Sequence, residues 1–285
     1  MKSLEQIKKA LKYRLYKLHP KAIFWDIKKK PNKNKPIVTK LKNGFQIQVY
    51  PRDILGKALY VLGYFEPDIT NFCNTFLKPG MVFFDIGSNI GYYSLLASKK
   101  VGEKGKVYSF EPNNQIIVEL KKNISLNSIK NIKVNQLALS EKKGKAKLSQ
   151  YEKGEEVYSS LSNTAYPGKK ITGYEKVNID TVDNFIKKNN INKVDLIKID
   201  VEGAELLVLK GSKKLLSDKK ASAIIFEMQD FLTQRFNYTC EDLIQFLENF
   251  GYKIYFFNNM KKILLTKDFS FENSHINNFI ALKTE

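Results

Sequence analysis

The residues that decide the fold are Met81-Val82-Phe83-Phe84-Asp85-Ile86-Gly87-Ser88-Asn89-Ile90-Gly91, followed by Tyr92-Tyr93-Ser94-Leu95-Leu96-Ala97. The apolar run at the start predicts a buried β-strand, and the later segment predicts an amphipathic helix. The two glycines between them predict a tight turn, which makes this stretch the first unit of an open α/β sheet. The turn contains no Gly-Lys-Ser/Thr sequence, so it does not fit a phosphate-binding loop of the Walker type.

A second predicted strand, Lys106–Phe110, ends in Glu111-Pro112. Glu111 lies 20 positions beyond Gly91, the separation at which α/β nucleotide sites place a carboxylate on ribose hydroxyls. Acids at two strand ends favour a ligand with an ammonium group and sugar hydroxyls, and S-adenosylmethionine is such a ligand. An NAD-binding unit is the alternative, but the Gly-x-Gly-x-x-Gly fingerprint is absent.

These motifs predict a binding site for the methyl donor at the carboxyl ends of the first two strands. The glycines are expected to let the backbone approach the ligand closely. The donor-binding residues predicted from the two motifs are Asp85, Gly87, Ser88, Asn89, Gly91, Glu111 and Pro112.

A third segment, Asp195-Leu196-Ile197-Lys198-Ile199-Asp200-Val201-Glu202-Gly203-Ala204-Glu205, is another strand that ends in acids and turns through glycine into a helix. Together with the first two motifs, and with Gly63–Pro67, Asn178–Asp183 and Phe226-Glu227, it resembles the FkbM family of S-adenosylmethionine-dependent methyltransferases. The resemblance covers about residues 60–230, with Ser88 where the family more often has alanine. It implies an α/β class I (Rossmann-like) fold with a seven-stranded, mostly parallel sheet, helices on both faces and one antiparallel strand from the C-terminus.

The resemblance also implies methyl transfer to a hydroxyl group of a sugar, glycan or other small molecule. In the wider fold the adenine lies past the third strand, here beside Ala138, and Asp200 can bind the methionine ammonium. RNA methylation and a non-catalytic donor-binding module are the alternatives. The Asp-Val-Glu-Gly turn differs from the Asn/Asp-Pro-Pro-aromatic turn of many amino methyltransferases, an acidic rim repels phosphates, and intact donor motifs favour catalysis.

A hydroxyl acceptor needs a base to remove its proton. His19 and His275 lie in polar segments, so carboxylates at strand ends are better candidates: Asp200, Glu227, and Glu202 if the extended backbone continues. Asp200 has two alternative roles, binding of the ammonium group or capping of the next helix. A divalent metal ion bridging the three acids is a further alternative, which the sequence does not establish. Glu205 is expected to be a surface or salt-bridge residue, and Lys198 is expected on the same strand face as Asp200.

The pattern along the chain predicts a hairpin over residues 37–50 and helices over 60–76, 114–127, 181–190, 204–216 and 241–250. It predicts further strands over 132–137, 223–226, 253–257 and 276–281. Between Ser140 and Gly173 the sequence becomes polar and irregular. We interpret residues 140–175 as an insertion that covers the substrate; a plain surface hairpin is the alternative. Cys73 and Cys240 are isolated and are expected to fill apolar space.

Charge separates the N-terminal segment from the rest. Of the net charge of +19, residues 1–37 carry +10, with apolar residues at helical spacing among their lysines. We predict a basic helical appendage and linker over residues 1–37 and a methyltransferase domain over 38–285, with its donor-binding core at about 78–230. The appendage fits an anionic membrane surface, and the alternative is a helix packed on the domain. Since no apolar run spans a bilayer and no signal peptide is evident, we predict a cytoplasmic protein, peripheral at the membrane. The sequence does not indicate the oligomeric state.

Overall fold

The computed structural model describes residues 20–23, 35–50, 54–152, 154–258, 260–266, 269, 271 and 276–284. The chain divides into two compact units, Met1–Glu66 and Pro67–Glu285. Most of the predicted basic appendage lies outside the described residues, as do His19 and His275. The proposed boundary between appendage and domain therefore stays a prediction. Within the described residues, no helix is long and apolar enough to cross a membrane.

In the first unit, the predicted hairpin is confirmed. Strands β1 (Ile37–Lys40) and β2 (Gln46–Val49) pair antiparallel, and Gly44 takes φ +94° in the turn between them. The predicted helix over residues 60–76 is wrong in its extent, because the chain forms two helices, α3 (Ile54–Leu62) and α4 (Pro67–Phe76). Gly63 ends the first with φ +74°, and Pro67 begins the second, the positions that these residue types favour.

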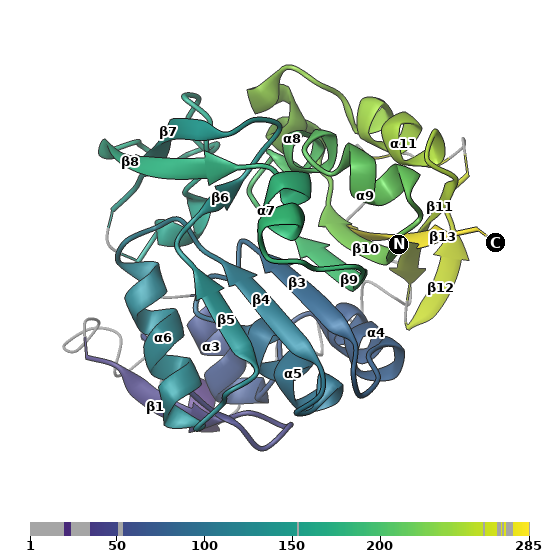
Figure 1. Cartoon of the computed structure of the whole chain (residues 1–285). Helices are drawn as coiled ribbons and strands as arrows, with labels where there is room; N and C mark the ends of the chain where they lie inside the picture. The colour runs from purple at the N-terminus through teal and green to yellow at the C-terminus, as the bar shows by residue number, and fades with distance from the viewer. Residues whose placement is uncertain are drawn as a thin grey trace, which may run out of the picture. The chain divides into compact units, whose positions relative to one another are not determined.

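The second unit is built on an eight-stranded sheet in the order β12-β11-β13-β10-β9-β3-β4-β5 (Figure 1). The five strands from β10 to β5 are parallel, whereas β13 runs antiparallel to β10 and β11. The mostly parallel sheet with its one reversed strand is therefore confirmed for seven strands. The strands are β3 (Val82–Ile86), β4 (Lys106–Phe110), β5 (Ile132–Asn135), β9 (Val194–Ile199), β10 (Ala221–Glu227), β11 (Tyr252–Asn258), β12 (Lys261–Leu264) and β13 (Asn278–Lys283).

The eighth strand, β12, was not predicted. It pairs antiparallel with β11 at the edge of the sheet, and all four of its residues are exposed. An edge strand that buries nothing carries no alternation of polar and apolar residues, so its sequence gives no strand signal.

Helices cover both faces of the sheet, as predicted. On one face, Phe185 of α7 packs its ring against Phe84 and Phe110, within the core that α8, α9 and α11 complete. On the other face, Ser94 of α5 bonds Asp85, the neighbour of Phe84 in β3. The helices are α5 (Tyr92–Val101), α6 (Ile116–Leu126), α7 (Val182–Lys188), α8 (Glu205–Lys210), α9 (Lys213–Ser217) and α11 (Cys240–Glu248).

The predicted helix over residues 204–216 is broken into α8 and α9 at Gly211. A Cβ atom there would lie 2.1 Å from the carbonyl oxygen of Ser140, so the backbones approach too closely for any other residue. Cys73 and Cys240 are both buried, as expected.

A second, three-stranded sheet has the order β6-β8-β7, from β6 (Ala138–Leu139), β7 (Gly144–Gln150) and β8 (Gly173–Asp180). Residues 140–175, interpreted above as an insertion that covers the substrate, thus include β7, which pairs antiparallel with β8 over its full length. That they cover the substrate stays a prediction. Residues 151–172 lie outside the strands, and from here on the insertion denotes this narrower segment. It contains one short 3-10 helix, η1 (Glu156–Tyr158). Figure 1 shows the small sheet above strands β3, β4 and β5 of the central sheet.

Candidate active site

The glycine turn after β3 is held by close contacts within the protein. Gly87 takes φ +81°, and a Cβ atom there would lie 1.8 Å from the carbonyl oxygen of Asp200. Gly91 takes φ +93°, and its Cβ atom would lie 2.5 Å from Cδ1 of Leu120. Gly87 is thus required by packing and by backbone conformation, and Gly91 by its backbone conformation. The predicted close approach of these glycines to a ligand stays a prediction.

Asp85 is buried beneath this turn. Ser94 Oγ donates a hydrogen bond of 2.5 Å to Asp85 Oδ2, and it also lies 2.6 Å from Ser109 Oγ. Burial raises the pKa of Asp85 to about 6, although the nearby positive charge of Lys198 opposes this shift. The carboxyl group therefore ties α5 to β3 and, through the serine pair, to β4.

Glu111 connects the end of β4 to the glycine turn. Its Oε2 accepts a hydrogen bond from the backbone N–H of Asn89 (3.0 Å), and its Oε1 accepts one from Asn113 (2.9 Å). Burial raises the pKa of Glu111 to about 7. A carboxylate has about four lone-pair sites, so two remain for hydroxyl donors. Ser88 Oγ donates to the carbonyl of Asp85 (2.7 Å), inside the same turn.

Two predicted donor-binding residues lie around this arrangement. Pro112 directly follows Glu111 and is half-buried. Ala138 begins β6 of the small sheet, where it packs with Leu148 and Val177. The predicted third strand over residues 132–137 is shorter than expected, because β5 ends at Asn135 and the chain then enters the other sheet. Contact of either residue with the donor stays a prediction.

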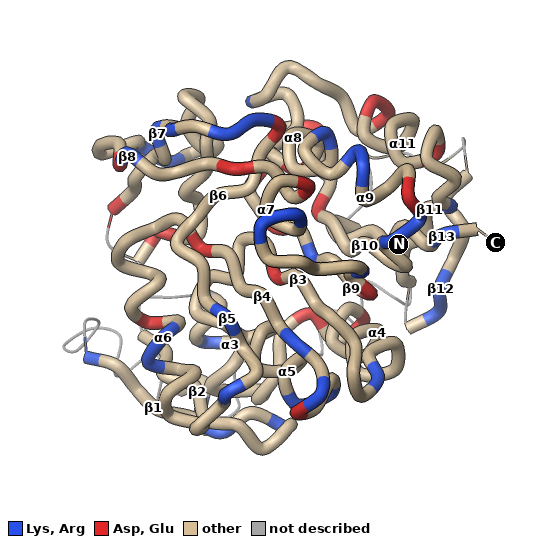
Figure 2. The backbone as a smooth tube through the Cα atoms, viewed as in Figure 1, with Lys and Arg blue, Asp and Glu red and all other residues tan. Residues whose placement is uncertain are grey.

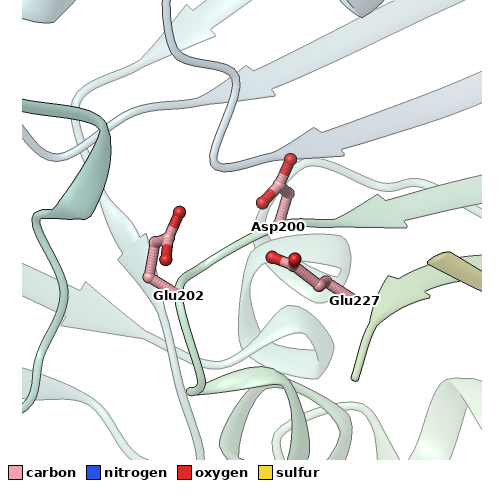
Figure 3. Close-up of side chains that lie close together, drawn as sticks. All are labelled: Asp200, Glu202 and Glu227. Atoms are coloured by element: carbon pink, nitrogen blue, oxygen red, sulfur yellow. The ribbon is translucent and has the colours of Figure 1, made fainter. Parts of the chain in front are cut away.

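Three carboxylates meet at the carboxyl ends of β9 and β10. Asp200, Glu202 and Glu227 each offer an oxygen atom within 4.8 Å of the others, and all three side chains are half-buried (Figure 3). We call these residues the carboxylate cluster. Glu202 was expected here on the condition that the extended backbone continues, but it takes φ +57°. The left-handed turn, rather than a longer strand, brings its carboxylate to the other two.

The carboxylate cluster combines one ion-paired acid with two acids whose charge is disfavoured. Lys198 Nζ lies 2.6 Å from Asp200 Oδ2, as their shared strand face predicted, and it also lies 4.6 Å from the centre of the Tyr93 ring. Burial raises the pKa of Glu202 and of Glu227 well above the usual range, and the charge of Asp200 raises both further. A carboxyl group whose pKa is raised toward neutral pH is better suited to accept a proton there.

The expected surface position of Glu205 is wrong. Its side chain is 1% exposed, and Oε1 accepts hydrogen bonds from the backbone N–H groups of Val201 (3.0 Å) and Gly203 (3.3 Å). The Tyr238 hydroxyl donates to the carbonyl of Gly203 (2.7 Å). Glu205 therefore shapes the turn that carries Glu202, a role that helical periodicity does not reveal because the two N–H groups lie in the turn before the helix.

Two residues near the carboxylate cluster were also missed. Tyr166 of the insertion packs its ring against Phe231 (5.3 Å between ring centres), and Arg235 bonds both the insertion and Glu202. One signal in the sequence pointed to Arg235: of 48 basic residues, only Arg14, Arg52 and Arg235 are arginine. In so lysine-rich a chain, an arginine marks a position that uses the planar fork of the guanidinium group.

The strand order, the glycine turn after β3 and the acid at the end of β4 define an α/β class I methyltransferase fold. The family model described as "Methyltransferase FkbM domain" matches residues 85–254, and the chain belongs to this family.

The chain is 28% identical over 154 residues to "Methyltransferase sdnD" of Sordaria araneosa, covering 45% of this chain and 58% of that protein. It is 26% identical over 143 residues to "Methyltransferase 1" of Beauveria bassiana, covering 45% and 56%. The chain thus spans somewhat more than half the length of these relatives. Among solved structures, a methyltransferase FkbM from Methylobacillus flagellatus aligns with a TM-score of 0.44 at 14% identity, over 80% of this chain and 54% of that one.

Proposed function

We propose that this protein is an S-adenosylmethionine-dependent O-methyltransferase that acts on a hydroxyl group of a sugar, glycan or other small molecule. The observation that carries the proposal is the junction between the glycine turn and the carboxylate cluster. The backbone N–H of Asp200 donates to the carbonyl of Ile86 (2.9 Å), and Gly87 packs on the carbonyl of Asp200. The glycine turn, where we expect the donor, and the candidate bases are therefore adjacent.

The residues of the turn fit the donor chemically. Glu111 has acceptor sites left for the ribose hydroxyls, and Asp200 presents a half-buried carboxylate suited to an ammonium group. When bound, S-adenosylmethionine supplies a methyl group on a sulfonium centre. The protein then has to align the acceptor oxygen and exclude water.

The structure favours Glu227 or Glu202 over Asp200 as the group that receives the acceptor proton. Asp200 is ion-paired with the buried Lys198, which suits it to binding and orientation. Gln229 Nε2 donates to Glu227 Oε1 (2.6 Å) and orients that carboxyl group, leaving Oε2 for a proton. Their raised pKa values place both glutamates closer to the range of an effective general base.

A divalent ion at the carboxylate cluster is a further prediction that its geometry supports. Oxygen ligands are those that Mg²⁺ and Ca²⁺ prefer, and the three acids offer oxygens within 4.8 Å of one another. Addition of EDTA should then abolish turnover, and Mg²⁺ should restore it. Unchanged turnover in both steps would discard the ion.

RNA methylation is the less favoured alternative. Lysines are spread over many elements in Figure 2, including β7, α7, α9 and β12, whereas the carboxylate cluster would repel a phosphate backbone. The test is calorimetry with S-adenosylhomocysteine, followed by turnover assays with sugars, lipid-linked glycans and RNA. We expect micromolar binding and turnover with a hydroxyl-bearing carbohydrate. No binding would sink the assignment, and turnover with RNA alone would replace the acceptor class.

A further inference from the structure

Arg235, in the 3-10 helix η2 (Gln234–Phe236) that follows α10 (Asp230–Thr233), bonds two parts of the chain that are far apart in sequence. Toward the insertion, Nη2 donates to Ser160 Oγ (2.9 Å) and to the carbonyl of Thr164 (3.0 Å), and Nε donates to the same carbonyl (3.2 Å). Toward the carboxylate cluster, Nη1 donates to the carbonyl of Glu202 (3.1 Å). Both ends of the guanidinium group are therefore engaged.

The backbone around Arg235 strengthens the same connection. Ser162 Oγ donates to the carbonyl of Arg235 (3.2 Å), so the insertion is bonded to the main chain as well as the side chain. On the other side, a Cβ atom at Gly203 would lie 2.5 Å from the carbonyl oxygen of Leu232. The segment from α10 to η2 thus packs directly on the turn that carries Glu202.

The insertion brings an aromatic side chain to this place. The ring of Tyr166 is tilted against that of Tyr158 (4.3 Å between ring centres) and contacts Phe231 edge-on (5.3 Å). It also lies 5.8 Å from the guanidinium carbon of Arg235. Burial and the nearby charges of Glu202 and Glu227 together raise the pKa of Tyr166 to about 12. Because Arg235 also donates to the carbonyl of Glu202, Tyr166 lies beside the guanidinium group that holds the Glu202 turn.

We propose that Arg235 is a positioning residue that holds the insertion and the Glu202 turn in one arrangement, so that Tyr166 forms a wall of the acceptor site beside the carboxylate cluster. The inference rests on the proposed function, because the cluster is taken as the place of methyl transfer. Lysine cannot replace Arg235 in this role, since one ammonium group cannot reach Ser160, Thr164 and Glu202 in a fixed plane.

The test compares Arg235→Ala and Arg235→Lys with wild type by hydrogen exchange, using the full chain loaded with S-adenosylhomocysteine. In both variants we expect amides of residues 159–166 and 201–205 to exchange about tenfold faster. Peptides from β3 and the glycine turn, and the affinity for S-adenosylhomocysteine, should stay unchanged. Lys169→Ala is the matched control, because Lys169 bonds Glu155 (2.6 Å) inside the insertion and should leave residues 201–205 unaffected.

A second measurement separates positioning from plain stabilisation. With a carbohydrate acceptor from the turnover assays, both Arg235 variants should raise KM for the acceptor while KM for S-adenosylmethionine stays constant. Unchanged exchange in Arg235→Ala, full rescue by Arg235→Lys, or faster exchange throughout the unit would each overturn the proposal. Failure of wild type to bind S-adenosylhomocysteine would count against the proposed function instead. Hydrogen exchange of the unliganded protein would still show whether Arg235 holds the insertion and the Glu202 turn together.

Discussion

The proposed donor side and the proposed acceptor side of this protein are built in different ways. On the donor side, the turn and its carboxylate partner lie between Asp85 and Glu111, and hydrogen bonds connect them through Asn89. On the acceptor side, the carboxylate cluster, Tyr166 and Arg235 come from the insertion, from the turn after β9, and from the end of β10 and the segment after it. The donor side depends on local backbone geometry, whereas the acceptor side depends on long-range contacts. Substitutions on the donor side should therefore change donor affinity, and substitutions on the acceptor side should change turnover.

The largest effect is expected from the candidate bases. Glu227→Gln or Glu202→Gln should reduce turnover by about 10²- to 10⁴-fold while leaving donor affinity unchanged, because the amide keeps the shape and loses the proton acceptor. Single-turnover kinetics and calorimetry measure the two quantities. Glu248→Gln, an exposed position on α11, is the control. If donor affinity falls as much as turnover does, the division into a donor side and an acceptor side is wrong.

The next effect concerns the stability of the glycine turn. Gly87→Ala would place a methyl group 1.8 Å from the Asp200 carbonyl at φ +81°, so we expect a loss of about 3 kcal/mol or more in the free energy of unfolding. Gly80→Ala is the matched control, with φ +89° and no atom within 4 Å; it should cost about 1 kcal/mol. Urea unfolding measures both, and equal losses would contradict the packing argument.

The buried acids predict a dependence of stability on pH. Burial raises the pKa of Asp85 to about 6 and of Glu205 to about 7. Since these values exceed those of the unfolded chain, the stabilisation is fully present below about pH 4 and is lost as the pH rises through about 7. We expect the free energy of unfolding to be about 4 kcal/mol lower at pH 8 than at pH 5.

Glu205→Gln tests which carboxyl group causes this slope. The amide oxygen can still accept from Val201 and Gly203, while the buried charge is removed, so the slope should flatten. Thermal unfolding between pH 5 and pH 8 provides the measurement. A slope identical to that of wild type would assign the pH dependence to other groups.

A smaller effect is expected for Glu111→Gln. The new NH₂ group would face the backbone N–H of Asn89 or Asn113, so that two donors would meet. It would also replace one oxygen that can accept from a ribose hydroxyl. The affinity for S-adenosylhomocysteine should therefore fall about tenfold. Calorimetry against the Glu248→Gln control decides the matter. Affinity equal to wild type would mean that Glu111 serves only to hold the turn.

The smallest effect per residue concerns the basic segment. We propose that residues 1–37 recruit the protein to an anionic membrane that carries a lipid-linked acceptor. Each lysine near such a surface contributes about 1 kcal/mol, and the attraction should weaken as salt rises. Co-sedimentation with vesicles that contain or lack phosphatidylserine should separate full-length from truncated protein. Equal sedimentation would reject recruitment and favour a helix packed on the domain.

The parts that the sequence predicted well are those with local signals. The strand, turn and helix around Gly87, the strand end at Glu111 and the three members of the carboxylate cluster were all located before the structure. The errors fall where tertiary contacts decide: the break at Gly211 exists because Ser140 approaches it, and Glu205 is buried because the turn after β9 folds over it.

The sequence by itself determined an α/β fold, because apolar strand periodicity, turn glycines and strand-end acids follow from the chemistry of neighbouring residues. The class I arrangement of the strands was what the resemblance to the FkbM family implied. It also determined that acids would gather at one edge, since parallel strands end on the same side of a sheet. Only the tertiary structure decided how those acids differ. Their burial, the ion pair of Lys198 with Asp200 and the tether through Arg235 depend on groups brought together from distant segments, and solvation and charge act through space rather than along the chain.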